Sequence, residues 1–171
     1  MVSMKNRYLT AAVIEFSFKD RKMAFVPGPR QCGKTTLANM LLRKRDAKAY
    51  WNWDNLEFRR RWTENPSSVI PETEEGVVPL VVLDEIHKHY RWKGYLKGVY
   101  DTLESPCDIL VIGSARLSIY RRHSDSLFGR HYNFRLHPFS IREMERADSI
   151  FPDEVIDALF SQSLRQRKSR R

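Results

Sequence analysis

The chain has 171 residues, of which 42% are hydrophobic, and a formal net charge of +9. This length fits one globular domain, which would bury roughly 70% of the surface that its unfolded chain exposes. Two cysteines, Cys32 and Cys107, are too few for a disulfide framework, and neither has a second Cys or His at metal-ligand spacing. The composition therefore argues against a disulfide-rich secreted domain and predicts a reducing compartment.

The apolar runs are short. The longest, VVPLVVL at 77–83, is far below the ~20 residues of a membrane-spanning helix, and Pro79 interrupts it. The apolar segment 11–14 is followed at once by Glu15, so no secretory signal can be drawn there. We therefore expect a soluble cytoplasmic protein with no membrane segment.

The first predicted elements are a helix, a strand and a second helix. Residues 6–19 carry apolar side chains at helical spacing, which predicts an N-terminal helix. Residues 22–27 are typical of a short buried strand, and a glycine-bearing loop separates them from a predicted helix at 34–44. A second strand is predicted at 49–53, followed by a polar helical stretch that extends to Thr63.

The second half repeats this alternation. Residues 64–76 are loop-like, with two prolines and a glycine. The remaining predicted elements are strands at 79–85, 107–114 and 131–136, a helix from Trp92 to Leu103, and helices at about 138–147 and 152–164. Strands that alternate with helices predict an α/β fold, with a parallel sheet and helices on both faces.

The loop between the first strand and the second helix matches a phosphate-binding motif. Gly28 to Thr35 fit G-x-x-x-x-G-K-[ST] in the strand–loop–helix context that this motif requires. Lys34 would reach the β- and γ-phosphates of ATP, and Thr35 would ligate Mg²⁺. The residues expected to bind the nucleotide are Gly28, Pro29, Arg30, Gln31, Cys32, Gly33, Lys34, Thr35 and Thr36.

Two carboxylates end the strand VVLDE. Asp84 is expected to hold Mg²⁺ through its water shell, and Glu85 to orient and deprotonate the attacking water. Because small-molecule kinases generally do not need the second carboxylate, the pair favours hydrolysis. A kinase with the segment RLSIYRR at 116–122 as an arginine lid is the alternative enzyme.

Further candidates follow the later strands. Ser114 would contact the γ-phosphate if its strand lies between the other two motif strands; a plain Gly-Ser turn is the alternative. Arg130, with Arg116 as the weaker candidate, would stabilise transition-state charge in its own chain or in a neighbouring subunit, unless it is a solvated surface residue. His87 and His89 follow the acidic pair, but the sequence has no third ligand at metal spacing, so we do not expect a zinc site.

Five segments together resemble the prokaryotic AAA-type ATPases of the AAA-14 family over about residues 6–146: GPRQCGKTTL, YWNWDN, VVLDEIHKHYRWKGYLKGVYD, ILVIGSARL and SLFGRHYNFRLHPFSIREM. The resemblance implies a three-layer P-loop NTPase sandwich. Its five-stranded parallel sheet would have the order 5-1-4-3-2, with nucleotide at the carboxyl ends of the strands.

This resemblance implies Mg²⁺-dependent ATP hydrolysis coupled to a protein partner, a second copy or a further domain. We expect an ATPase core at 1–150, a helix at 151–164 and a basic tail at 165–171 that is either solvated or contacts nucleic acid. Family members usually continue into a large C-terminal region, and His87 stands where we would expect glutamine. A nucleotide-binding remnant without hydrolysis, or a basic nucleic-acid adaptor, is the non-enzymatic alternative.

Overall fold

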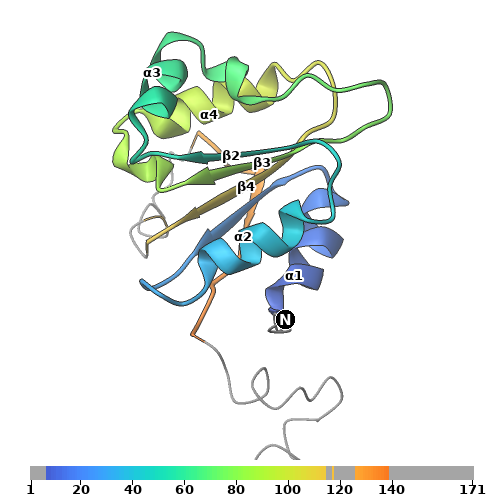
Figure 1. The fold of residues 1–171 in the computed structure, drawn as a ribbon, viewed down its shortest axis with the longest axis vertical. Helices are drawn as coiled ribbons and strands as arrows, with labels where there is room; N and C mark the ends of the chain where they lie inside the picture. The colour runs from blue at the N-terminus through green and yellow to red at the C-terminus, as the bar shows by residue number, and fades with distance from the viewer. Residues whose placement is uncertain (1–6, 115–116, 118–125, 139–171) are drawn as a thin grey trace, which may run out of the picture. The chain divides into compact units, whose positions relative to one another are not determined.

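The computed structural model describes residues 7–114, 117 and 126–138, and its central element is a five-stranded parallel sheet (Figure 1). Its order, β2-β3-β4-β1-β5, confirms the predicted order 5-1-4-3-2. The strands are β1 (Met23–Pro27), β2 (Lys48–Asn52), β3 (Leu80–Asp84), β4 (Asp108–Gly113) and β5 (His131–Asn133).

The three central strands are buried along their whole length, because helices cover both faces of the sheet. Alternate side chains of each strand enter different cores. In β1, for example, Ala24 and Val26 belong to one core, while Met23 and Phe25 belong to the other. This period of two explains why the strands are continuous apolar runs in the sequence.

One face of the sheet packs against the N-terminal helix and the helix that follows the phosphate loop. These are α1 (Leu9–Ala12), its π-helical continuation η1 (Val13–Phe18), and α2 (Lys34–Leu42). They contribute Leu9, Val13, Phe18, Leu37 and Leu41 to the first core.

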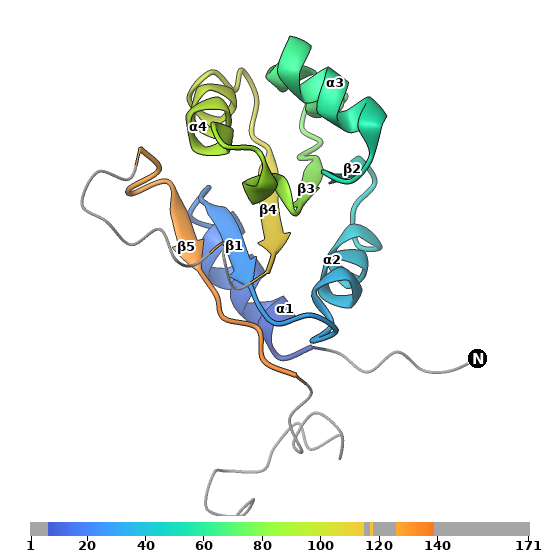
Figure 2. The same cartoon turned by 90° about the vertical axis from the view of Figure 1, so that its left-hand side faces the viewer.

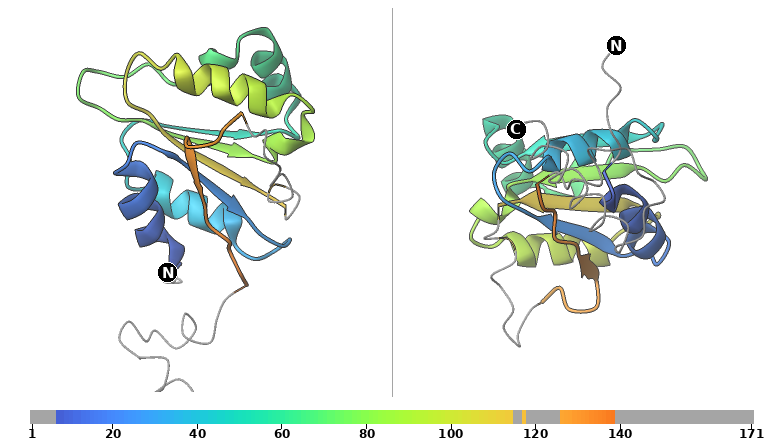
Figure 3. Two further views of the ribbon diagram at one scale, coloured as in Figure 1. Left: turned by 180° about the vertical axis from the view of Figure 1, so that it is seen from behind. Right: turned by 90° about the horizontal axis from the view of Figure 1, so that it is seen from below.

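The other face packs against α3 (Leu56–Glu64), the 3₁₀ turn η2 (Pro66–Val69) and α4 (Trp92–Asp101). Figures 2 and 3 show α1 and α2 on one side of the sheet and α3 and α4 on the other. The aromatic side chains of this second core are Phe25, Phe58, Trp62 and Trp92. The predicted three-layer sandwich is therefore confirmed.

The last strand is shorter than predicted. β5 ends at Asn133, although the next residues still run beside β1, with hydrogen bonds from Phe134 N to Phe25 O (2.7 Å) and from Leu136 N to Pro27 O (3.1 Å). The predicted helices at 138–147 and 152–164, the basic tail and Arg116 lie outside the described residues. Within those residues, no helix has both the length and the apolar character needed to span a bilayer.

Candidate active site

The carboxyl end of β4 holds the two sequence motifs next to each other. Gly28 N donates to Gly113 O over 3.1 Å, and Glu85 N donates to Ile112 O over 2.9 Å. Consecutive carbonyls of β4 therefore bind the start of the phosphate loop on one side and the acidic pair on the other. Ser114 follows directly, so the structure brings all three predicted elements to one edge of the sheet.

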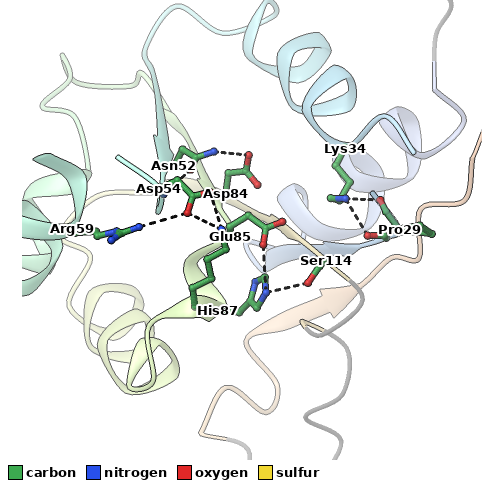
Figure 4. A network of polar contacts seen from close by, with 11 residues as sticks. Pro29, Lys34, Asn52, Asp54, Arg59, Asp84, Glu85, His87 and Ser114 are labelled. Atoms are coloured by element: carbon green, nitrogen blue, oxygen red, sulfur yellow. Dashed lines mark hydrogen bonds and ion pairs between the residues drawn. The ribbon is translucent and has the colours of Figure 1, made fainter. Parts of the chain in front are cut away.

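The phosphate loop leads into α2, whose first residue is Lys34. Gly33 caps the helix at φ +90°, a conformation that glycine adopts readily, and Gln31 is also left-handed at φ +59°. Lys34 Nζ donates to Gly28 O over 3.0 Å and to Pro29 O over 2.7 Å (Figure 4). The ammonium group thus lies over its own loop, at the amino end of a helix whose dipole favours anions.

Gly28 is needed for close packing rather than for its torsion angles. A Cβ atom at this position would lie 2.7 Å from Cys32 Sγ and 2.7 Å from Leu136 O. Cys32 itself is 2% exposed, which favours a packing role over an oxidisable thiol. By contrast, Pro29, Arg30, Gln31 and Thr35 are exposed, as residues that meet a nucleotide should be.

A buried arginine that the sequence analysis missed supports this loop from behind. Arg7 is 1% exposed and donates to Cys32 O over 2.9 Å and to His137 O over 2.6 Å. It thereby connects the N-terminal segment, the phosphate loop and the chain after β5. No local pattern marks this role, because the two carbonyls lie 25 and 130 residues away along the chain.

Two residues of β2 hold Asp84 in place. Tyr50 donates its hydroxyl to Asp84 Oδ2 over 2.6 Å, and Asn52 Nδ2 donates to the same oxygen over 3.1 Å. Burial raises the pKa of Asp84, while the hydrogen bond from Tyr50 acts in the opposite direction. Neither residue belongs to a nucleotide motif, and their polar side chains at the end of a predicted neighbouring strand are the only signal of this role in the sequence.

The residues expected to hold Mg²⁺ have a common neighbour in Tyr50. Burial, and next the bond to Asp84, raise the pKa of this tyrosine, whereas hydrogen bonding by Thr35 lowers it. In the described part of the chain, no group of three or more His, Cys, Asp or Glu residues could hold a metal. A hydroxyl and a carboxylate nevertheless fit Mg²⁺, which keeps several waters and substrate phosphates as its remaining ligands.

Glu85, His87 and Ser114 form a connected group (Figure 4). His87 Nε2 lies 3.5 Å from Glu85 Oε2 and 3.1 Å from Ser114 Oγ. Glu85 has a left-handed backbone, with φ +57° and ψ +19°, which is uncommon for a residue other than glycine, Asn or Asp. Such backbone conformations cluster at functional sites, and here it accompanies the carboxylate that the sequence assigns to catalysis.

Arg130 lies at the amino ends of the strands, whereas the phosphate loop lies at their carboxyl ends. Its guanidinium donates to both carboxylate oxygens of Asp101, over 2.6 and 3.0 Å, and its carbonyl accepts from Met23 N at the start of β1. Because all five strands are parallel, the amino end of β1 is far from the phosphate loop. For Arg130, this position argues against a catalytic role within its own chain; a role in a neighbouring subunit, and any role of Arg116, stay predictions.

Comparisons with known proteins agree with the fold. Residues 20–145 match the AAA_14 family, described as an AAA domain. The chain is similar to the Orc1 protein of Aeropyrum pernix, solved in complex with DNA, with a TM-score of 0.51 and 14% identity over 81% of this chain and 45% of that one. It is also similar to C. elegans PCH-2, with a TM-score of 0.47 and 15% identity over 84% and 48%.

The chain thus spans less than half the length of either solved structure. At these identities, the similarity to Orc1 concerns the fold alone. No curated protein matches the sequence.

Proposed function

This chain belongs to the AAA_14 family of AAA domains, and we propose that it binds ATP with Mg²⁺ and hydrolyses the ATP to ADP and phosphate. One observation supports this most. The carbonyls of Ile112 and Gly113 accept hydrogen bonds from Glu85 and Gly28, so the phosphate loop and the acidic pair flank the same strand end. Binding and hydrolysis need these two motifs side by side.

In this proposal, each motif residue has one task. The backbone N–H groups of the phosphate loop and the ammonium of Lys34 bind the β- and γ-phosphates. Thr35 and Asp84 hold Mg²⁺, which when bound neutralises negative charge on the phosphate oxygens. Glu85 accepts a proton from the attacking water, and Ser114 donates a hydrogen bond to the γ-phosphate.

The adjacent carboxylates favour hydrolysis over phosphoryl transfer to a small molecule. Tyr50 and Asn52 both donate hydrogen bonds to Asp84, while the Glu85 carboxylate lies 3.5 Å from His87 Nε2. In this proposal the two carboxylates have different tasks, because Asp84 holds the metal and Glu85 accepts a proton from the attacking water. The kinase alternative depends on residues 116–122, of which only Leu117 is among the described residues.

We further propose that hydrolysis is coupled to a partner protein, a second copy or a further domain, as the resemblance to AAA-type ATPases implies. In an oligomer, Arg130 or Arg116 of a neighbouring copy would stabilise the negative charge of the transition state. Nucleic acid is a second candidate partner, on the basis of the cationic residues in 165–171.

Phosphate release from ATP by the purified chain tests the enzymatic proposal. Glu85→Gln should keep ATP affinity and lose turnover by roughly two or more orders of magnitude, because an amide cannot take the proton of the attacking water. Lys34→Ala should lose both binding and turnover. Normal hydrolysis by Glu85→Gln would exclude the role given to Glu85, and a wild-type chain that binds ATP without turnover would support the non-hydrolysing alternative.

A further inference from the structure

We propose that His87 is a positioning residue that connects Ser114 to Glu85 and leaves the hydroxyl proton of Ser114 available to the γ-phosphate. The inference rests on the proposed ATP hydrolysis, and extends it to a residue outside both motifs. Glu85 is the N-cap of the 3₁₀ turn η3 (Ile86–Lys88), which contains His87, and Ser114 follows the neighbouring strand β4. Figure 4 shows the imidazole between the carboxylate and the hydroxyl.

A single ring nitrogen makes both contacts, and this favours one placement of the ring hydrogen. Nε2 of His87 lies 3.5 Å from Glu85 Oε2 and 3.1 Å from Ser114 Oγ. An ionised carboxylate only accepts hydrogen bonds, so Nε2 must carry a hydrogen for the contact with Glu85 to be favourable. With that hydrogen on Nε2, the oxygen of Ser114 acts as acceptor toward His87.

This direction of the Ser114 bond has a consequence for the nucleotide. A serine hydroxyl has one proton and two lone pairs, so Ser114 can accept from His87 and still donate to a phosphate oxygen. In the other tautomer, Nε2 would present a lone pair to the carboxylate, which is repulsive. It would also accept a hydrogen bond from the Ser114 hydroxyl, whose hydrogen would then not be available to the phosphate. The geometry therefore favours the arrangement in which Ser114 is an oriented donor.

The packing of the ring holds this arrangement in place. The His87 side chain is 6% exposed, and a Cβ atom at Gly113 would lie 2.8 Å from its Nδ1 and 2.9 Å from its Cε1. Gly113 has no positive φ angle, so a glycine is needed here because it leaves space for the imidazole. The turn itself is closed by hydrogen bonds from Lys88 N to Glu85 O and from His89 N to Ile86 O, each 3.0 Å.

The two contacts also differ in strength. At 3.5 Å, the contact with Glu85 is longer than an ordinary hydrogen bond, while the contact with Ser114 is within the normal range. Glu85 is thus oriented by the imidazole, yet its carboxylate keeps the capacity to accept a proton from water. His87 acts through Glu85 and Ser114, and has no reacting atom of its own.

The first experiment needs no nucleotide. Long-range ¹H–¹⁵N NMR of the histidine side chains in the ligand-free chain reports which ring nitrogen carries hydrogen, with the His87 signal assigned by its loss in His87→Gln. We expect a hydrogen on Nε2, and a changed Nε2 shift in Ser114→Ala. A His87 protonated on Nδ1 alone would overturn the proposal, whether or not the chain hydrolyses ATP.

The second experiment measures steady-state kinetics. His87→Ala should lower kcat about tenfold or more with KM for ATP changed by no more than about threefold, because the contact is needed in the transition state. His87→Gln, which keeps a side-chain N–H donor, should recover part of that loss. The double variant His87→Ala/Ser114→Ala should be no slower than the slower single variant, since both act through one connection.

His89→Gln is the matched control, because the ring of His89 packs against those of Trp53 and Tyr95 and, within the described part of the chain, makes no hydrogen bond to Glu85 or Ser114. It should keep the wild-type kcat. Melting curves of each variant separate unfolding from loss of positioning, and His87→Gln carries the test if His87→Ala does not fold. A wild-type chain that hydrolyses ATP alongside a fully active His87→Ala would overturn this inference and leave the proposed function intact.

Discussion

The hydroxyl of Tyr50 in β2 donates a hydrogen bond to Asp84 of β3 over 2.6 Å. The two strands are paired with Tyr50 opposite Val82 and Asn52 opposite Asp84, so the tyrosine reaches across to a residue two positions further along its neighbour. Because Asn52 bonds to the same oxygen, Asp84 is held by two donors from one strand. The carboxylate that we propose to bind Mg²⁺ is therefore positioned by β2, a strand that carries no part of either nucleotide motif.

Tyr50→Phe tests that positioning. Without the hydroxyl, the pKa of Asp84 rises further and its carboxylate can rotate, so Mg²⁺-dependent ATP binding or turnover should fall by about tenfold. Calorimetric titration with ATP at several Mg²⁺ concentrations measures the change. Tyr132→Phe is a matched control, since Tyr132 donates to Asp20 over 2.8 Å at the other edge of the sheet. Equal losses in both variants would contradict a specific role for Tyr50.

Gly28→Ala should damage the phosphate loop. The added Cβ would lie 2.7 Å from Leu136 O, a backbone atom that cannot move independently, so we expect about 1–3 kcal/mol of destabilisation and loss of ATP binding. Gly98→Ala in α4 is the control, because nothing lies within 4 Å of its added Cβ, and it should stabilise the chain by about 0.5–1 kcal/mol. Urea unfolding measures both. A Gly28→Ala chain that binds ATP like the wild type would rule out the packing argument.

Much of the site could be predicted from the sequence because it depends on contiguous residues. The phosphate loop needs a fixed spacing of glycines and Lys34, and the acidic pair must end a buried strand. Parallel strands then place Asp84, Glu85 and Ser114 at one edge of the sheet. The sheet order itself came from resemblance to a family, since alternation of strands and helices indicates a parallel sheet but leaves its order open.

The contacts of the supporting residues could not be predicted, because they depend on register and packing between distant segments. Arg7 contacts two carbonyls far along the chain, and Tyr50 reaches Asp84 only through the pairing of β2 with β3. The position of Arg130 also depends on strand pairing. A glycine before an arginine suggests a presented side chain, but the parallel pairing of β5 with β1 puts it at the amino edge.

Arg7→Lys should weaken the connection between the phosphate loop and the chain after β5. A lysine ammonium is a compact group that cannot reproduce the two-pronged contact of Arg7 with Cys32 O and His137 O. Leaving a buried carbonyl without its donor costs about 1–3 kcal/mol, so we expect that loss of unfolding free energy and weaker ATP binding. Arg60→Lys, whose side chain is 80% exposed, should change neither. If Arg7→Lys is as stable as Arg60→Lys, the proposed support does not exist.

The pair of Arg130 and Asp101 should contribute to stability in a pH-dependent way, and contribute nothing to ATP binding by a single chain. The Arg130 guanidinium lowers the pKa of Asp101 below its ordinary value of 3.8. The stabilisation is therefore present above that pH and is lost as the pH falls through the lower folded-state pKa. Melting temperatures of the wild type and Asp101→Asn should differ slightly at neutral pH and converge in acid, because the pair is exposed.

Arg130→Ala measures the separate question of catalysis. In a monomeric sample, ATP affinity and turnover should stay within about twofold of the wild type, because the guanidinium is bound to Asp101 at the opposite edge from the phosphate loop. Turnover measured against protein concentration distinguishes the remaining role. If Arg130 acts on a neighbouring subunit, wild-type activity per chain rises with association while that of Arg130→Ala does not. A loss of activity in the monomer would instead mean that Arg130 reaches the site of its own chain.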